Sequence, residues 1–106
     1  MLHELTEKVI INGALVSAEA PSVDVHDPAT GKLIGKVGAA TMSEIERAIT
    51  AARNAFRPWA DLSGRVRSGH LHVLGDAIAA DADSMAQLMT LEQGKPVNEA
   101  RGEIMK

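Results

Sequence analysis

The apolar residues of this chain are numerous but small, and this limits the kind of core that it can form. Hydrophobic residues make up 45% of its 106 residues, yet Phe56 and Trp59 are its only aromatic side chains. Burial stabilises a fold by roughly 25 cal/mol per Å² of apolar surface, and alanine, which is abundant here, offers little of it. The sequence therefore suits a layer that coats a partner better than a core closed on all sides.

Charge and cysteine content exclude several function classes. The net charge of −3 argues against a nucleic-acid footprint and against a polybasic membrane signal. Neither a secretory signal nor an apolar run of membrane-spanning length is visible, so we expect a cytoplasmic protein. The absence of cysteine excludes disulfides, zinc-thiolate sites and a thiolate nucleophile within these residues.

Two β-hairpins are predicted near the start of the chain. Asn12-Gly13 separates two apolar triplets, and this dipeptide favours a tight turn in which both positions have positive φ. Residues 23–26 then alternate at the strand period, and residues 32–37 can return antiparallel to them. In the turn Asp27-Pro28-Ala29-Thr30-Gly31, Asp27 can accept backbone N–H bonds and Gly31 can adopt the left-handed conformation.

From Thr41 onward the apolar period changes from two to about 3.6, which predicts helices. Thr41 and Glu44 fit a capping box at the start of the first helix. Its apolar stripe, which we expect to face a partner surface, consists of Ile45, Ile49, Ala52 and Phe56. Because proline disfavours a helical residue before it, Arg57-Pro58-Trp59 is predicted to end this helix.

Two or three more helices follow in the prediction. Ser63 is the expected N-cap of the second helix, and either Asp81 or Asp83 can cap the third. Gly94 marks the exit of the third helix, and Pro96 can open a fourth. The inward residues of the third helix are predicted to be Met85, Leu88 and Met89, and in the fourth helix Val97, Ala100 and Ile104 would share one face. The predicted fold class is thus an α+β fragment with two N-terminal β-hairpins followed by three to four helices.

Five motifs occur in a fixed order along the chain and carry a family resemblance. They are Ile11-Asn12-Gly13, Asp27-Pro28-Ala29-Thr30-Gly31, Ala51-Ala52-Arg53-Asn54-Ala55-Phe56 with Trp59, Leu91-Glu92-Gln93-Gly94-Lys95-Pro96, and Glu99-Ala100-Arg101-Gly102-Glu103. This succession resembles the N-terminal part of NAD(P)-dependent aldehyde dehydrogenases, from about Val9 onward. Within that family, residues 88–96 are most similar to succinate-semialdehyde dehydrogenases, which oxidise a small carboxylated aldehyde to the diacid.

The resemblance implies an α/β parent enzyme with a Rossmann-type cofactor domain, a catalytic domain and an oligomerisation ribbon. Residues 1–106 would be an incomplete N-terminal part of the cofactor-binding domain. In this family a cysteine thiolate attacks the aldehyde, hydride passes to the nicotinamide of NAD or NADP, and a glutamate-activated water hydrolyses the thioester. All these groups are expected beyond Lys106, so no catalytic or cofactor-binding residue is assigned here, and the chain alone is expected to be inactive.

The expected partners are the remainder of the parent enzyme or another copy of the chain, in an oligomer. One alternative from a different class stays open. The chain could be a non-enzymatic interaction module that assembles with itself or with a complementary chain.

Glu92 is the one candidate ligand in the sequence. It precedes the predicted end of a helix, where the helix dipole disfavours a carboxylate by roughly 0.3–1 kcal/mol. In some members of the resembling family an acidic residue at this position, together with backbone carbonyls just before the Asp-Pro turn, holds a monovalent cation. Carried over, the ligands would be Glu92 and the carbonyls of Val25 and His26. The alternative is that Glu92 pairs with a lysine or points to water.

Other polar residues are assigned structural roles. His70 and His72 are two residues apart on a helix and so point about 200° away from each other, which excludes a ligand pair. Lys95 at a helix exit suits the helix macrodipole without any substrate. Val66 and His70 stand where related sequences usually carry Glu and an aliphatic residue, and they weaken the expected packing of the second helix.

Overall fold

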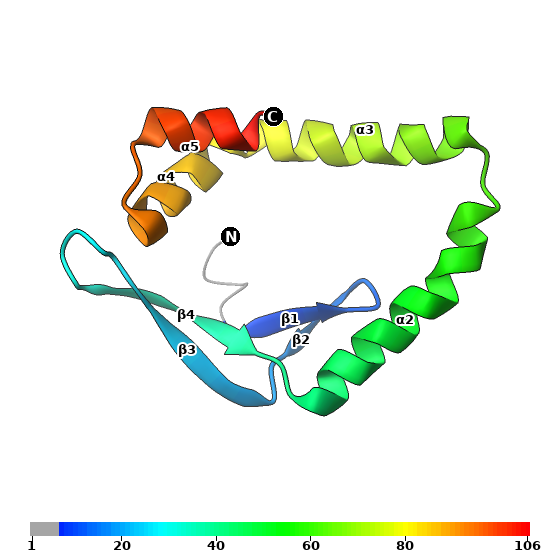
Figure 1. Ribbon diagram of the computed structural model, residues 1–106, viewed down its shortest axis with the longest axis horizontal. Coiled ribbons are helices and arrows are strands. Elements are labelled where there is room, and N and C mark those ends of the chain that lie inside the picture. Colours follow the sequence, from blue (N-terminus) through cyan, green and yellow to red (C-terminus); the bar gives the residue numbers. More distant parts are fainter. Residues whose placement is uncertain (1–6) are drawn as a thin grey trace. The chain divides into compact units, whose positions relative to one another are not determined.

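The computed structural model describes residues 7–106 (Figure 1). Within these residues the strands come first and four helices follow, which confirms the predicted order of two hairpins and then three to four helices. The strands are β1 (Lys8–Ile11), β2 (Ala14–Ser17), β3 (Ala20–His26) and β4 (Leu33–Ala39). The helices are α2 (Met42–Ala60), α3 (Gly64–Ala80), α4 (Ala82–Gln93) and α5 (Val97–Ile104).

The chain forms two compact units that interleave in sequence. The first contains residues up to Val25 together with Gly35–Asp61, and the second contains His26–Ile34 together with Leu62–Lys106. The strands pair as β1 with β2 and as β3 with β4, in two separate two-stranded sheets.

The β1–β2 hairpin closes as the sequence predicts. Its ladder is antiparallel and runs to the pair Ile11↔Ala14, with Asn12 and Gly13 at φ values of 53° and 75°. Two positive φ values define the type I′ turn, which matches the twist of the strands. Ile10 lies opposite Leu15 on the outer face of the ribbon, and these side chains are 70% and 50% exposed.

Helix α2 contacts β1. Its most shielded positions are Glu44, Ala48 and Ala51, one helical turn apart from each other. The helix runs to Ala60, beyond the end predicted at Pro58. Proline in the last turn removes only the one hydrogen bond that its own nitrogen would donate, so the helix continues for two more residues.

The second unit contains the tip of the second hairpin. The Asp27 carboxylate accepts hydrogen bonds from the Ala29 N–H (2.8 Å) and the Thr30 hydroxyl (2.7 Å). These bonds, that of Thr30 first, lower the pKa of Asp27. Gly31 has φ of 70° and donates its N–H to the Asp27 carbonyl at 2.7 Å, as predicted for this turn.

The helix boundaries in the second unit follow the predicted capping residues. Ser63 caps α3 by accepting the Val66 N–H at 3.3 Å. Asp81 occupies the N-cap position of α4, although its side chain makes no capping hydrogen bond. Gly94 ends α4 with φ of 75°, and its N–H donates to the Thr90 carbonyl at 2.8 Å. Pro96 directly precedes α5.

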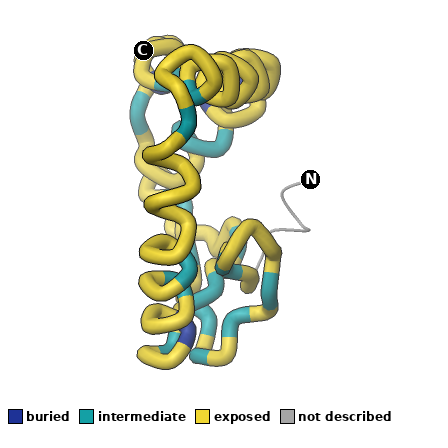
Figure 2. Tube along the Cα trace, turned by 90° about the vertical axis from the view of Figure 1, so that its right-hand side faces the viewer, coloured by how far each residue is buried: buried dark blue, intermediate teal, exposed yellow. Residues whose placement is uncertain are grey.

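The core is as thin as the composition predicts (Figure 2). Among residues 7–106 the buried apolar side chains are all alanines of α4 and α5, namely Ala82, Ala86 and Ala100. Leu88 and Met89, expected inward, are half-buried. Met85, expected inward, is 41% exposed, because the buried positions of α4 are those of Ala82 and Ala86; Val97 of the predicted α5 face is 45% exposed.

Candidate functional site

The one buried charge among the described residues is the Glu44 carboxylate, at 1% exposure. It accepts hydrogen bonds from the Thr41 N–H (2.8 Å), the Thr41 hydroxyl (3.1 Å) and the Glu19 N–H (3.3 Å to each oxygen). The Thr41 hydroxyl in turn accepts the Glu44 N–H at 3.2 Å, which completes the predicted capping box. The bond to Glu19 joins the start of α2 to the link between β2 and β3.

Two further charges surround this carboxylate. An Arg47 guanidinium nitrogen lies 3.5 Å from the Glu19 carboxylate and 3.9 Å from that of Glu44. The pKa of Glu44 is lowered, first by the Thr41 N–H and then, against the opposing effect of burial, by the Glu19 N–H, the Thr41 hydroxyl and Arg47. Because its oxygens are already bonded to neighbours, Glu44 stabilises the junction and is not available as a general base.

The sequence indicated the capping box of Glu44 but not its link to Glu19. The two residues are 25 positions apart, and no spacing rule connects a helix N-terminus to a strand connection at that distance. The opposite charges of Glu19 and Arg47 were the only available signal, and such charges are common on any surface.

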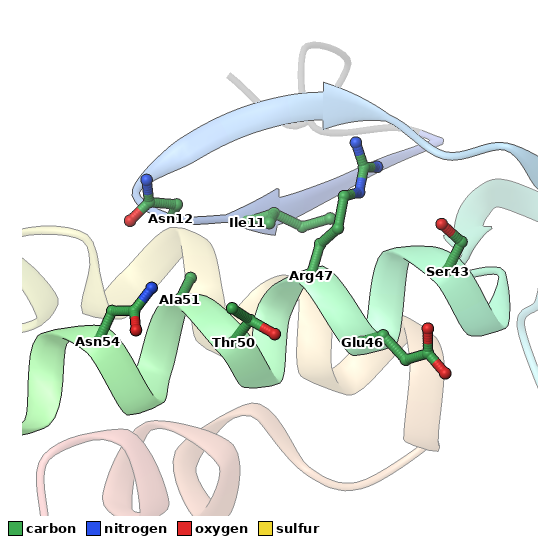
Figure 3. A pocket seen from close by; sticks show the side chains of 8 residues that line it. All are labelled: Ile11, Asn12, Ser43, Glu46, Arg47, Thr50, Ala51 and Asn54. Atoms are coloured by element: carbon green, nitrogen blue, oxygen red, sulfur yellow. The ribbon is translucent and has the colours of Figure 1, made fainter.

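An open groove of about 640 Å³ lies between the β1–β2 turn and α2 (Figure 3). It is lined by Ile11, Asn12, Ser43, Glu46, Arg47, Thr50, Ala51 and Asn54. Figure 3 shows Asn12 at the hairpin turn and Arg47 extending from the helix toward the strands. The groove thus offers amide and hydroxyl groups with one acid and one base. Its lining includes no cysteine, histidine or lysine.

The predicted cation ligands come from both units. Val25 and His26 end β3, and Val25 belongs to the first unit, whereas His26 and Glu92 belong to the second. Glu92 is exposed one residue before the end of α4, as expected, and no ion pair within residues 7–106 involves it. These residues contain no cluster of three or more His, Asp or Glu side chains suited to a metal. The predicted cation site consists of one carboxylate and two backbone carbonyls, so it is not a cluster of side chains of that type. It stays a prediction.

The turn between α4 and α5 is held by ion pairs. Lys95 contacts Glu103 at 2.7 Å, and Arg101 contacts Asp83 at 2.7 Å. The hydrogen bond and charge of Lys95 lower the pKa of Glu103. Lys95 therefore has a structural partner within the helix pair, in agreement with the structural role predicted for it.

Thr90 carries an unsatisfied polar atom close to this turn. Its hydroxyl is buried and has no hydrogen-bond partner among the described residues. Residues two apart on a helix point about 200° away from each other, so this hydroxyl does not share the face of Glu92. Buried polar groups are normally hydrogen-bonded, so the Thr90 hydroxyl is an exception among the described residues.

His72 of α3 makes a local contact. The His72 Nδ1 lies 2.9 Å from the carbonyl oxygen of Ser68, one turn earlier on the same helix.

No helix of the described residues is long and apolar enough to cross a membrane.

Comparison with known proteins relates this chain to a family. The family model described as "Aldehyde dehydrogenase family" matches the sequence of residues 15–106. Glutarate-semialdehyde dehydrogenase of Pseudomonas aeruginosa is 39% identical over 99 residues, which are 92% of this chain and 20% of that protein. The chain thus spans about one fifth of the length of the curated relatives that it matches.

Solved structures agree with the sequence matches. The succinate-semialdehyde dehydrogenase of Burkholderia pseudomallei superimposes with a TM-score of 0.86 at 37% identity, over 94% of this chain and 21% of the other. A betaine aldehyde dehydrogenase variant of Staphylococcus aureus in complex with NAD+ superimposes with a TM-score of 0.87 at 28% identity, over 97% of this chain and 21% of the other. Because the family match covers most of the chain, and a relative with 37% identity shares its fold, the chain belongs to the aldehyde dehydrogenase family.

Proposed function

We propose that this chain is the N-terminal part of the cofactor-binding domain of an NAD(P)-dependent aldehyde dehydrogenase. The enzyme would oxidise a small carboxylated aldehyde, with succinate semialdehyde as the first candidate, to the corresponding acid. The observation that carries this proposal is the family match over residues 15–106 in a chain whose large apolar side chains are mostly exposed. Such a segment has the fold of the family and lacks the cover that a complete member would provide.

The choice of substrate class rests on the relatives. One is a glutarate-semialdehyde dehydrogenase and another a succinate-semialdehyde dehydrogenase, and both substrates carry a carboxylate at the far end. No residue of this chain is assigned to the aldehyde, so the substrate would be selected by the rest of the enzyme. A cytoplasmic location is part of the same proposal.

The cofactor assignment is supported by the relative that was crystallised with NAD+. When bound, NAD or NADP accepts the hydride from the substrate. Residues 7–106 would support that site from a distance, because Glu44, Lys95 and Arg101 hold the local elements together and none of them is assigned to the cofactor.

Complementation tests this proposal directly. The chain would be expressed together with a polypeptide containing the remaining four fifths of the Pseudomonas aeruginosa relative, and aldehyde-dependent reduction of NAD and of NADP would be followed at 340 nm, the usual wavelength for such assays. We expect activity with glutarate or succinate semialdehyde only when both polypeptides are present. Turnover by the 106 residues alone, or a soluble complex without turnover, would contradict the proposal.

The second candidate function is a non-enzymatic interaction module. It is favoured by exposed apolar side chains in each unit, since Ile10 and Phe56 in the first unit and Val73 and Met105 in the second each expose half or more of their area. A defined complex that forms without restoring activity would favour this function over the enzymatic one.

A further inference from the structure

The β1–β2 turn contains the one asparagine of this chain that is followed by glycine. The other two asparagines, Asn54 and Asn98, are followed by alanine and glutamate and lie inside helices. Asn12 and Gly13 are both exposed, and Figure 3 shows the Asn12 amide at the tip of the ribbon. Glycine has no side chain that would obstruct an approach to its backbone nitrogen. A Cβ at Gly13 would meet no described atom within 4 Å, so the space around this nitrogen is open.

An asparagine before a glycine can lose its side-chain amide through a cyclic imide. The backbone nitrogen of Gly13, once it has lost its proton, forms a bond to the Asn12 Cγ. The Cγ–Nδ2 bond breaks and ammonia leaves. Water then opens the five-membered imide at either carbonyl. One product is aspartate, and the other is isoaspartate, in which the main chain runs through the former side-chain carbonyl.

The folded turn holds the two reacting atoms apart. The φ of 53° at Asn12 is that of the first central residue of a type I′ turn, for which ψ is about +30°. In an L-residue this ψ places the next backbone nitrogen roughly 150° from Cβ about the Cα–C bond. Ring closure needs the nitrogen and Cβ on the same side of that bond. The Gly13 nitrogen therefore cannot reach Cγ until the turn opens.

The hairpin that holds this turn is short. Its ladder consists of four residue pairs in a separate two-stranded sheet. The paired side chains of Ile10 and Leu15 are 70% and 50% exposed, so they contribute little buried area. A two-stranded hairpin on its own is at best marginally stable in water, and elements with few buried contacts open locally. The frequency of this opening would set the rate of the imide reaction.

We propose that Asn12 is a deamidation site whose reaction is controlled by the opening of the β1–β2 hairpin. Isoaspartate adds one methylene group to the main chain, so the two-residue turn can no longer join Ile11 to Ala14 in their present register. Either product also places a carboxylate in the groove that Glu46 lines, where the amide is neutral. The proposal concerns the chemical ageing of the chain and is independent of the reaction of the complete enzyme.

Timed incubation followed by digestion and mass spectrometry tests this control. The chain would be incubated at neutral and at mildly alkaline pH, alone and with the remaining four fifths of the Pseudomonas aeruginosa relative. A peptide of residues 9–16 serves as the unfolded reference. We expect conversion of Asn12 to be on the order of tenfold slower in the chain than in the peptide, and faster at the higher pH. Asn54 and Asn98 should convert far more slowly than Asn12.

Two matched variants separate hairpin opening from the chemistry of the turn. Leu15→Gly removes the cross-strand partner of Ile10 without changing the turn residues, and should accelerate the conversion several-fold toward the rate of the peptide. Leu33→Gly removes a side chain of similar exposure, 53%, from a strand position in the second unit, and should leave the rate unchanged. Conversion in the chain at the rate of the peptide in both preparations would overturn the proposal. So would a rate that Leu15→Gly does not change.

Hydrogen exchange tests the structural consequence. Isoaspartate and aspartate products are separated by chromatography against synthetic standards. The amides of β1 and β2 should lose protection in the isoaspartate product and keep it in the Asn12→Asp chain, because aspartate retains the normal main chain and tolerates positive φ. Equal protection in the isoaspartate product and in the unmodified chain would contradict the proposed loss of the turn.

Discussion

Replacement of Gly94 by alanine tests how the turn between α4 and α5 is held. Gly94 has φ of 75°, and a Cβ at this position would lie 3.1 Å from the Pro28 Cγ within the same unit. The left-handed conformation costs an L-residue about 1–2 kcal/mol. The close contact requires Pro28 to shift by a few tenths of an ångström, which adds up to about 1 kcal/mol. We therefore expect Gly94→Ala to destabilise the turn by about 1–3 kcal/mol.

Hydrogen exchange followed by mass spectrometry measures this effect locally. The relevant amides are those of residue 94, bonded to the Thr90 carbonyl, and of Ala100, bonded to the Pro96 carbonyl. A loss of 1–3 kcal/mol makes local opening roughly 5- to 150-fold more frequent, and exchange should accelerate by the same factor. Gly94→Asn should lie between wild type and Gly94→Ala, because asparagine tolerates the left-handed region better than alanine.

Gly102→Ala is the matched control, because Gly102 lies within α5 and a Cβ there would meet nothing within 4 Å. It should slow exchange in α5, since alanine favours a helix interior over glycine by about 0.5–1 kcal/mol. If Gly94→Ala left exchange unchanged while Gly102→Ala slowed it, the reasoning on the left-handed turn would be refuted.

Three further predictions concern single side chains. Thr41→Ala removes the N-cap of α2 and should lower the free energy of unfolding by about 0.5–2 kcal/mol in a guanidinium titration, whereas Thr50→Ala in mid-helix should not lower it. Because the folded pKa of Glu44 lies below its ordinary value of 4.5, its contribution to stability is present above that pH and is lost as the pH falls through the folded pKa. Glu44→Gln should therefore flatten the acid limb of a stability–pH curve, and an unchanged limb would contradict this account. If Glu92 holds a monovalent cation, sodium and potassium should stabilise the complete enzyme unequally, and Glu92→Gln should abolish that difference. Crystals soaked in rubidium should show density at the site. The absence of all three effects would contradict the cation hypothesis.

Local signals predicted the local structure well. Asn12 and Gly13 specify their turn because both need positive φ, and Thr41 with Glu44 specifies a helix start. The predicted end of α2 was too early because Pro58 disrupts only one hydrogen bond so close to the helix terminus. Rules that depend on a few neighbouring residues therefore worked, and their errors were confined to element ends.

Long-range structure could not be predicted in the same way. The bond from the Glu19 N–H to Glu44 depends on where a strand connection meets a helix, which no spacing in the sequence encodes. The expectation that Met85 is inward came from helical spacing alone, and the buried positions of α4 are those of Ala82 and Ala86 instead. The candidate cation site shares this limitation, because its assignment came from family resemblance and depends on carbonyls far from Glu92 in the sequence.

The central claim is that this segment is built to be covered by the rest of an aldehyde dehydrogenase, and helix α3 provides the most direct test. No residue of α3 is buried, and Val66, Leu71, Val73, Leu74 and Ile78 are 36–70% exposed. Hydrogen exchange of α3 would be measured in the chain alone and after addition of the remaining four fifths of the Pseudomonas aeruginosa relative. Our account predicts that the α3 amides change from rapid exchange to strong protection in the complex, and equal exchange in the two states would contradict it.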